Sequence, residues 1–133
     1  MAITVAIRDQ AGARGDAADA LELDVPAALT LRDLIRTRVR EEVAKANAAV
    51  AAGASFRTLV QPVDAEVTLN GYRLKTGRTI DWERQADKAE EAFLRNGFFV
   101  LVDGRQVVEL DEELALTAGS DIRFVRLTPL VGG

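Results

Sequence analysis

The sequence predicts an α+β fold, in which β-hairpins and two helices share one chain of 133 residues. Three observations predict it. Apolar residues alternate with polar ones near both ends of the chain, which is typical of half-buried strands. An apolar stripe with helical spacing follows the first alternating region. Asn-Gly and Asp-Gly pairs, which favour tight hairpin turns, lie between later apolar runs.

The N-terminal part of the chain predicts a hairpin. Apolar residues alternate with smaller or polar ones over residues 3–8, which predicts a strand. Residues 9–19 contain two glycines and three aspartates and predict a turn or loop. Alternation returns over residues 21–25, and Pro26 ends this second strand.

A long helix is predicted to follow the hairpin. The Thr30 hydroxyl can accept backbone N–H bonds from a first helical turn, and Asp33 stands at the third helical position. An alanine-rich stretch can continue the helix as far as Ala52, and Gly53 is a plausible stop. The apolar stripe of this helix consists of Leu31, Leu34, Ile35, Val39 and Val43.

The middle of the chain predicts a loop, a small hairpin and a second helix. Residues 56–64 are expected to form a loop with a few apolar anchors, and residues 66–74 a hairpin around Asn70-Gly71. Asp81 can cap the second helix, which Asn96-Gly97 ends. The buried face of this helix is marked by Trp82, Ala86, Ala89 and Phe93.

The C-terminal third predicts three more strands. The apolar run at residues 98–102 is followed by a turn at Asp103-Gly104 and by a partner strand at residues 106–110. A turn at residues 118–121 leads to a final strand at residues 122–127.

Composition excludes several classes of protein. The chain has no cysteine and no histidine, which excludes disulfides, Cys/His zinc sites, cysteine nucleophiles and catalytic histidines. A net charge of −4 and a pI of about 4.9 argue against a nucleic-acid partner. The adjacent carboxylates Asp111, Glu112 and Glu113 predict a solvated turn rather than a metal site. No apolar run approaches the roughly 20 residues of a membrane helix, and no signal peptide is evident, so we expect a cytoplasmic protein with no membrane partner.

The order of these elements is similar to that of the ubiquitin-like β-grasp superfamily. Within it the chain resembles bacterial ubiquitin-like modifiers and the MoaD/ThiS-type sulfur carriers. Three segments carry the resemblance: residues 100–107 (VLVDGRQV), residues 110–125 and the terminal residues 129–133 (PLVGG). The resemblance implies a single β-grasp domain over residues 1–133, with a mixed sheet and a long helix across it. An inserted helix and small hairpin, at about residues 48–97, have no counterpart in the small carriers.

The resemblance also implies where the chemistry takes place. In this superfamily a partner enzyme adenylates the terminal carboxylate, here that of Gly133, and the carrier supplies no catalytic side chain. Gly132 and Gly133 have no Cβ, so the tail can pass through a narrow channel to reach the ATP. ATP is used by the activating partner, which would be a ubiquitin-activating or MoeB/ThiF-like enzyme, and no cofactor or metal is expected to bind the chain itself.

The other expected contacts flank these glycines. Pro129 would stiffen the exit from the last strand, and Leu130 and Val131 would supply apolar contacts in the partner's groove. Arg123 and Arg126 on the last strand are a possible partner surface.

Three functions remain open from the sequence. A modifier would pass its C-terminus to a target amine, with a conjugating enzyme and a JAB-type protease as possible further partners. A sulfur carrier would form a C-terminal thiocarboxylate and donate sulfur to an acceptor. A non-covalent β-grasp interaction module would use neither reaction. The insertion favours the modifier, because an added helix and hairpin suggest further partner contacts.

Overall fold

The computed structural model describes residues 2–11, 20–52, 58–61, 65–68, 71–74 and 79–126. The chain divides into two compact units, one formed by Met1–Leu34 with Ala92–Gly133 and the other by Ile35–Glu91. The second unit contains most of the insertion expected at residues 48–97, together with the greater part of the first helix. In the described ranges, no helix combines the length and the apolar character needed to cross a membrane.

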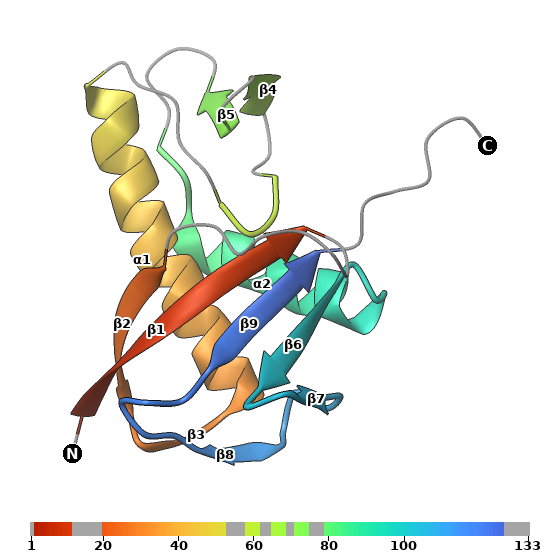
Figure 1. The fold of residues 1–133 in the computed structure, drawn as a ribbon. Coiled ribbons are helices and arrows are strands. Elements are labelled where there is room, and N and C mark those ends of the chain that lie inside the picture. Colours follow the sequence, from red (N-terminus) through yellow and green to blue (C-terminus); the bar gives the residue numbers. More distant parts are fainter. Residues whose placement is uncertain are drawn as a thin grey trace. The chain divides into compact units, whose positions relative to one another are not determined.

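The first unit is built on a mixed five-stranded sheet with the order β2-β1-β9-β6-β7. The last strand of the sequence, β9, lies in the middle: it pairs in parallel with β1 and antiparallel with β6, and Figure 1 shows the three side by side. The chain is therefore an α+β protein with a mixed sheet, as the sequence predicts. The strands are β1 (Ala2–Ala11), β2 (Leu21–Pro26), β6 (Phe98–Val102), β7 (Arg105–Val107) and β9 (Ile122–Arg126).

Strand alternation determines which face of this sheet is buried. Val5 and Ile7 of β1 are buried, whereas Thr4 and Arg8, which flank them in the sequence, are exposed. The same period on the other strands gathers apolar side chains on one face: Leu23, Val25, Phe98, Val100, Val102, Val107, Ile122 and Phe124. Phe98 stacks on Phe124 with ring centroids 5.7 Å apart. Full burial of side chains of this size stabilises a fold by about 1.5–3 kcal/mol each.

The predicted turn at Asp103-Gly104 is confirmed. Both residues have positive φ, 51° and 82°, which is the requirement of a type I′ hairpin turn. The Asp103 N–H donates to the Asp121 carbonyl, and the Asp121 N–H donates to Asp103 Oδ1, both at 2.8 Å. These two bonds hold the turn against the start of β9.

The strand after this turn is shorter than predicted. β7 ends at Val107 rather than at Leu110. The Leu110 carbonyl accepts the Arg32 N–H at 2.8 Å. It therefore bonds the first turn of a helix instead of pairing with a neighbouring strand.

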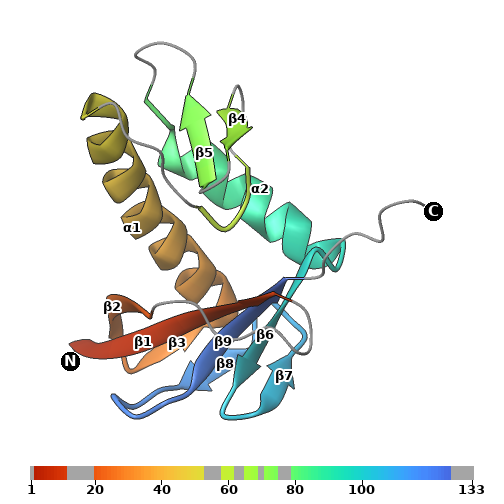
Figure 2. The ribbon, with the colours of Figure 1, turned by 45° about the horizontal axis from the view of Figure 1, so that its top comes forward.

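A small second sheet was not predicted from the sequence. It pairs β3 (Ala28–Thr30) with β8 (Glu113–Ala115) in antiparallel register, as seen in Figure 2. Strands of three residues are too short to show a period, and the predicted end of the second strand at Pro26 falls just before β3.

The first helix, α1 (Leu31–Ala51), begins directly after β3 at the predicted cap. The Asp33 N–H donates to Thr30 Oγ1 at 3.1 Å, and the Thr30 N–H donates to Asp33 Oδ2 at 3.3 Å. These reciprocal bonds form a capping box with aspartate in place of the usual glutamate. The apolar stripe predicted for this helix is buried along its whole length. The predicted stop at Gly53 lies outside the described residues. The prediction of a loop at residues 9–19 is wrong for residues 9–11, which extend β1 alongside β9, and residues 12–19 lie outside the described residues.

The second helix, α2 (Trp82–Leu94), also begins at its predicted cap, because Asp81 Oδ1 accepts the Glu83 N–H at 3.0 Å. Three of the four residues expected on its buried face are buried. Trp82 is the exception. It is partly exposed, and the guanidinium groups of Arg36 and Arg40 lie 5.8 and 5.4 Å from its ring centroid.

The second unit also contains the small hairpin formed by β4 (Ala65–Thr68) and β5 (Gly71–Leu74), which confirms the hairpin predicted for residues 66–74. Gly71 is the first residue of β5 and lies opposite Thr68, while Asn70 lies outside the described residues.

Polar side chains of α1 hold the irregular segments of the second unit. The Leu59 N–H donates to Glu42 Oε1 at 3.1 Å, which ties the loop at residues 58–61 to α1. The side-chain amide of Asn47 bonds both backbone groups of Ile80, with distances of 2.7 and 3.2 Å. These bonds satisfy backbone groups that have no regular ladder of their own.

Candidate functional site

The chain leaves the five-stranded sheet from the middle of that sheet. β9 ends at Arg126, which lies opposite Ala11 of β1 on one side and Phe98 of β6 on the other. Whatever follows Arg126 therefore starts between two neighbouring strands rather than at a sheet edge. The residues expected to form the activated tail lie outside the described residues: Pro129, Leu130, Val131, Gly132 and Gly133.

Arg123 is held in place on β9 by a carboxylate and an amide. Its Nε donates to both carboxylate oxygens of Asp121, at 3.2 and 3.3 Å, and its Nη1 donates to Gln10 Oε1 at 3.4 Å. In the sheet register Arg123 lies next to Arg8 of β1, which is exposed. Two guanidinium groups thus occupy neighbouring positions on the outer face of the sheet, the face opposite the buried one.

Arg123 and Arg126 do not share a face of the sheet. They are three residues apart, and side chains on a strand alternate with a period of two. Arg126 has the same parity as the buried Phe124, whereas Arg123 has the parity of the outer face. A partner that docks on the outer face would therefore contact Arg123 but not Arg126.

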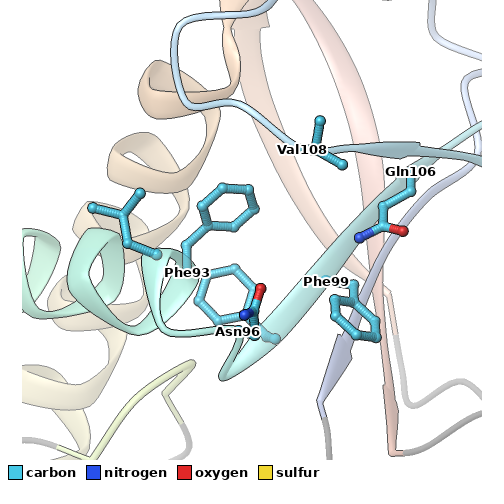
Figure 3. A pocket seen from close by; sticks show the side chains of 7 residues that line it. Phe93, Asn96, Phe99, Gln106 and Val108 are labelled. Atoms are coloured by element: carbon cyan, nitrogen blue, oxygen red, sulfur yellow. The ribbon is translucent and has the colours of Figure 1, made fainter.

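A groove with both apolar and polar lining opens beside the first residues of β6. It is a cavity of about 120 Å³, and Figure 3 shows its lining side chains. Leu94 is 67% exposed and Val108 is 63% exposed, and among the described residues these are the large hydrophobic side chains left exposed. Both line this groove. The full lining consists of Phe93, Leu94, Asn96, Phe98, Phe99, Gln106 and Val108.

The groove is a consequence of how α2 ends. The Gly97 N–H donates to the Ala92 carbonyl at 2.8 Å, and the Asn96 N–H donates to the Phe93 carbonyl at 3.0 Å. With Asn96 at a φ of 61°, this is a Schellman motif, which turns the chain sharply into β6.

The other wall of the groove depends on the length of β7. β7 pairs with β6 from Val100 onward, so Phe98 and Phe99 extend beyond its end. The groove occupies this space, between the end of a helix and the end of a strand.

The groove residues were not selected as site residues from the sequence, although weak signals for them exist. Leu94 follows Phe93 directly, so it falls outside the apolar stripe of α2. Val108 follows Val107, and two neighbouring residues of a strand point to opposite faces, so one of the two had to point outward. Neither signal shows that the two side chains line the same groove.

The acidic residues after β7 are engaged in ion pairs. Arg32 donates to Asp111, and Arg105 Nη2 donates to Glu112 Oε2 at 2.6 Å. This hydrogen bond to the Glu112 carboxylate raises the pKa of Arg105 above its ordinary value. Within the part of the chain that the structure describes, no three acidic side chains are grouped so that they could hold a metal ion.

Comparison of the chain with protein-family models, with curated proteins and with solved structures finds no match. Neither Arg123 nor the groove receives a role from a relative. The chemistry open to this chain must therefore be inferred from its own strand order, its surface and the sequence that follows β9.

Proposed function

We propose that this chain is a ubiquitin-like modifier of the β-grasp type. Its Gly133 carboxylate is adenylated by a ubiquitin-activating-type partner and then transferred to a target amine. One observation carries the proposal. The last described strand, β9, lies between β1 and β6 in the middle of the sheet, and Gly132-Gly133 follow its last residue, Arg126, after five intervening residues.

The strand order supports the β-grasp assignment. An N-terminal hairpin (β2-β1), a final strand parallel to β1, and a second hairpin (β6-β7) on its far side make up the sheet that the resemblance predicts. In the proposed β-grasp fold, α1 is the long helix between the two hairpins. The insertion at about residues 48–97, most of which lies in the second unit, supplies surface that a minimal carrier lacks and is available for further partners.

The proposed chemistry needs no side chain of this chain. A carboxylate oxygen of Gly133 attacks the α-phosphorus of ATP, pyrophosphate leaves, and a mixed anhydride with AMP forms. A thiolate of a partner enzyme then attacks the Gly133 carbonyl carbon and AMP leaves. A target amine displaces that thiolate, loses a proton, and an amide bond results. The first step is a displacement at phosphorus, the next two are displacements at the Gly133 carbonyl carbon, and none of the three needs an oxidant or a reductant.

The outer face of the sheet is the proposed docking surface for the activating partner. Arg123 is restrained there by Asp121 and Gln10, so its charge is presented with little loss of side-chain entropy on binding. Arg8 stands beside it and adds a second positive charge. A partner of complementary acidic character would be steered toward this face.

Mass spectrometry tests the proposal directly. An N-terminally tagged chain is recovered from its own host without reducing agents, and its intact mass and tryptic peptides are measured. Because trypsin cleaves after Arg126, the expected result is the tail remnant LTPLVGG, residues 127–133, on lysines of other proteins. A free chain with sulfur in place of one terminal oxygen would instead establish a sulfur carrier. An unmodified terminus under all conditions would favour a non-covalent module.

Two variants control this measurement. Deletion of Gly133 should abolish adenylation by the activating enzyme, while circular dichroism remains that of the parent chain. Addition of one residue after Gly133 should have the same effect unless a protease removes it. Adenylation of the shortened chain would show that the carboxylate of Gly133 is not the reactive group.

A further inference from the structure

The groove beside β6 has the character of a binding site for one aliphatic side chain. Its volume of about 120 Å³ is close to the ~150 Å³ of an apolar protein cavity that takes up benzene. Its walls are supplied by phenylalanine, leucine and valine side chains, two of which are exposed in the absence of an occupant. Exposed apolar side chains gathered in one concave place mark an interaction site, whereas scattered ones do not.

The rim of the groove suits an extended peptide. Asn96 and Gln106 line it, and their amide groups can both donate to and accept from a peptide backbone. Figure 3 shows these two amides at the groove, one from the end of α2 and one from β7. The groove therefore offers polar contacts for a backbone and an apolar space for a side chain.

The sequence that follows β9 starts next to this groove. Arg126, the last residue of β9, lies opposite Phe98, which is itself a groove residue. Neighbouring strands are about 4.8 Å apart, so the line of β7 is about 10 Å from β9, on the far side of β6. Residues 127–130 span about 13 Å when extended. Leu130 is therefore within reach of the groove.

We propose that the groove holds the chain's own C-terminal segment, with the Leu130 side chain seated between Leu94 and Val108. Docking requires only that the Leu130 side chain fit against the apolar side chains of the groove and that the segment be long enough to place it there. Its consequence rests on the proposed function: in the docked state the Gly133 carboxylate is withheld, and the activating partner must displace the segment to reach it. The groove then regulates access to the reactive terminus.

Methyl NMR of the full chain tests the docking. The Leu94 and Val108 methyl signals are assigned and followed in Leu130→Asp and in the matched control Thr128→Asp, which adds the same charge two residues earlier. Leu130→Asp should shift both methyl signals, and Thr128→Asp should leave them in place. Amide signals of residues away from the groove should be unchanged, because Leu130→Asp removes only the contacts proposed there.

Two results would overturn the docking. Methyl signals that are the same in the parent chain and in Leu130→Asp would show that Leu130 does not occupy the groove. Methyl shifts that disappear on dilution of the parent chain would assign the groove to a second copy of the chain instead.

A groove variant tests the regulatory consequence. Val108→Ser should lower the apparent Kd of the activating partner by about tenfold if about nine molecules in ten are docked, and the neighbouring change Glu109→Ser should not. An unchanged Kd in Val108→Ser, with the methyl result intact, would refute the regulation and keep the docking. A chain that is never adenylated would refute the proposed function and leave the methyl result standing.

Discussion

Arg38 and Glu42 form a buried ion pair one turn apart on α1. Arg38 Nε lies 3.2 Å from Glu42 Oε1, and the Arg38 residue is 1% exposed. Glu42 also accepts the Leu59 N–H, so a single carboxylate neutralises a buried cation and anchors a loop. Two charges removed from water are stable together only when each faces the other and is hydrogen-bonded.

Removal of Glu42 should therefore destabilise the second unit strongly. Glu42→Ala leaves the guanidinium without its facing carboxylate and is expected to lower the free energy of unfolding by about 3–5 kcal/mol. Urea unfolding followed by fluorescence of Trp82, the single tryptophan of the chain, measures this. Glu41→Ala, at the exposed neighbouring position, is the control and should change stability by about 0.5 kcal/mol or less. An equal effect of both changes would contradict the pairing.

Arg36 should contribute to stability in a manner that depends on salt but not on alkaline pH. Its Nη1 donates to Asp87 at 2.9 Å and to Glu90 at 2.5 Å, and these hydrogen bonds raise the pKa of Arg36. A raised pKa means that the folded state binds the proton more tightly. The contribution is thus fully present below the ordinary arginine pKa and is lost only as pH rises through the raised value.

The test compares Arg36→Gln with the parent chain in urea. The free energy of unfolding of Arg36→Gln should be lower than that of the parent chain by about 0.5–1 kcal/mol at low salt. This difference should be constant between about pH 7 and pH 10 and smaller near 1 M salt. Arg84→Gln, at an exposed position of α2, is the control and should show neither the difference nor the salt effect. A salt-independent loss would assign the effect to packing against Trp82 instead.

Gly104 is required by the turn between β6 and β7. Its φ of 82° is unfavourable for residues with a Cβ, although nothing lies within 4 Å of the position that a Cβ would occupy. Gly104→Ala should therefore lower the free energy of unfolding by about 1–2 kcal/mol through backbone strain alone. Gly119→Ala is the matched control, since its Cβ would meet only Thr117 Oγ1 at 3.9 Å. Thermal unfolding of both variants compares the two effects.

Phe124 and Phe99 should differ sharply when each is shortened to alanine. Phe124 is fully buried and stacked on Phe98, so Phe124→Ala should lower the free energy of unfolding by about 3–5 kcal/mol. Phe99 is partly exposed on the groove, and Phe99→Ala should cost clearly less. Urea unfolding of the two variants is the measurement. Equal losses would mean that Phe99 belongs to the core.

Arg123→Glu should weaken the activating partner without unfolding the chain. Reversal of a charge at a docking rim slows association and weakens its dependence on salt. Association rates measured at two salt concentrations test this, with unfolding in urea as the check on the fold. Arg126→Glu is the informative companion, because its side chain lies on the other face of the sheet and should affect partner association less.

Elements that depend on neighbouring residues could be predicted from the sequence. The Thr30–Asp33 cap, the Asp81 cap and the Asp103-Gly104 turn all act over two to four residues, and each is found where it was predicted. The longer strands were found for the same reason, because alternation is visible in the sequence once a strand has five residues or more. The opposite faces of Arg123 and Arg126 follow from the same rule of alternation.

Features that join distant residues could not be predicted in this way. Ala28 pairs with Ala115 in strands too short to show a period, and Leu94 and Val108 line one groove because a helix and a strand both stop beside Phe98. Arg38 is buried although arginine is usually exposed, because Glu42 and a loop close over it.

The sequence by itself determined the caps, the turns, the longer strands and the exclusion of cysteine and histidine chemistry, because these depend on local geometry and composition. Only the tertiary structure decided the place of β9 between β1 and β6, the burial of Arg38 and the existence of the groove. The physical reason is that each strand and each side chain has many possible partners far away in the sequence, and the free energy of the whole fold decides among them. A short segment of sequence does not contain this information.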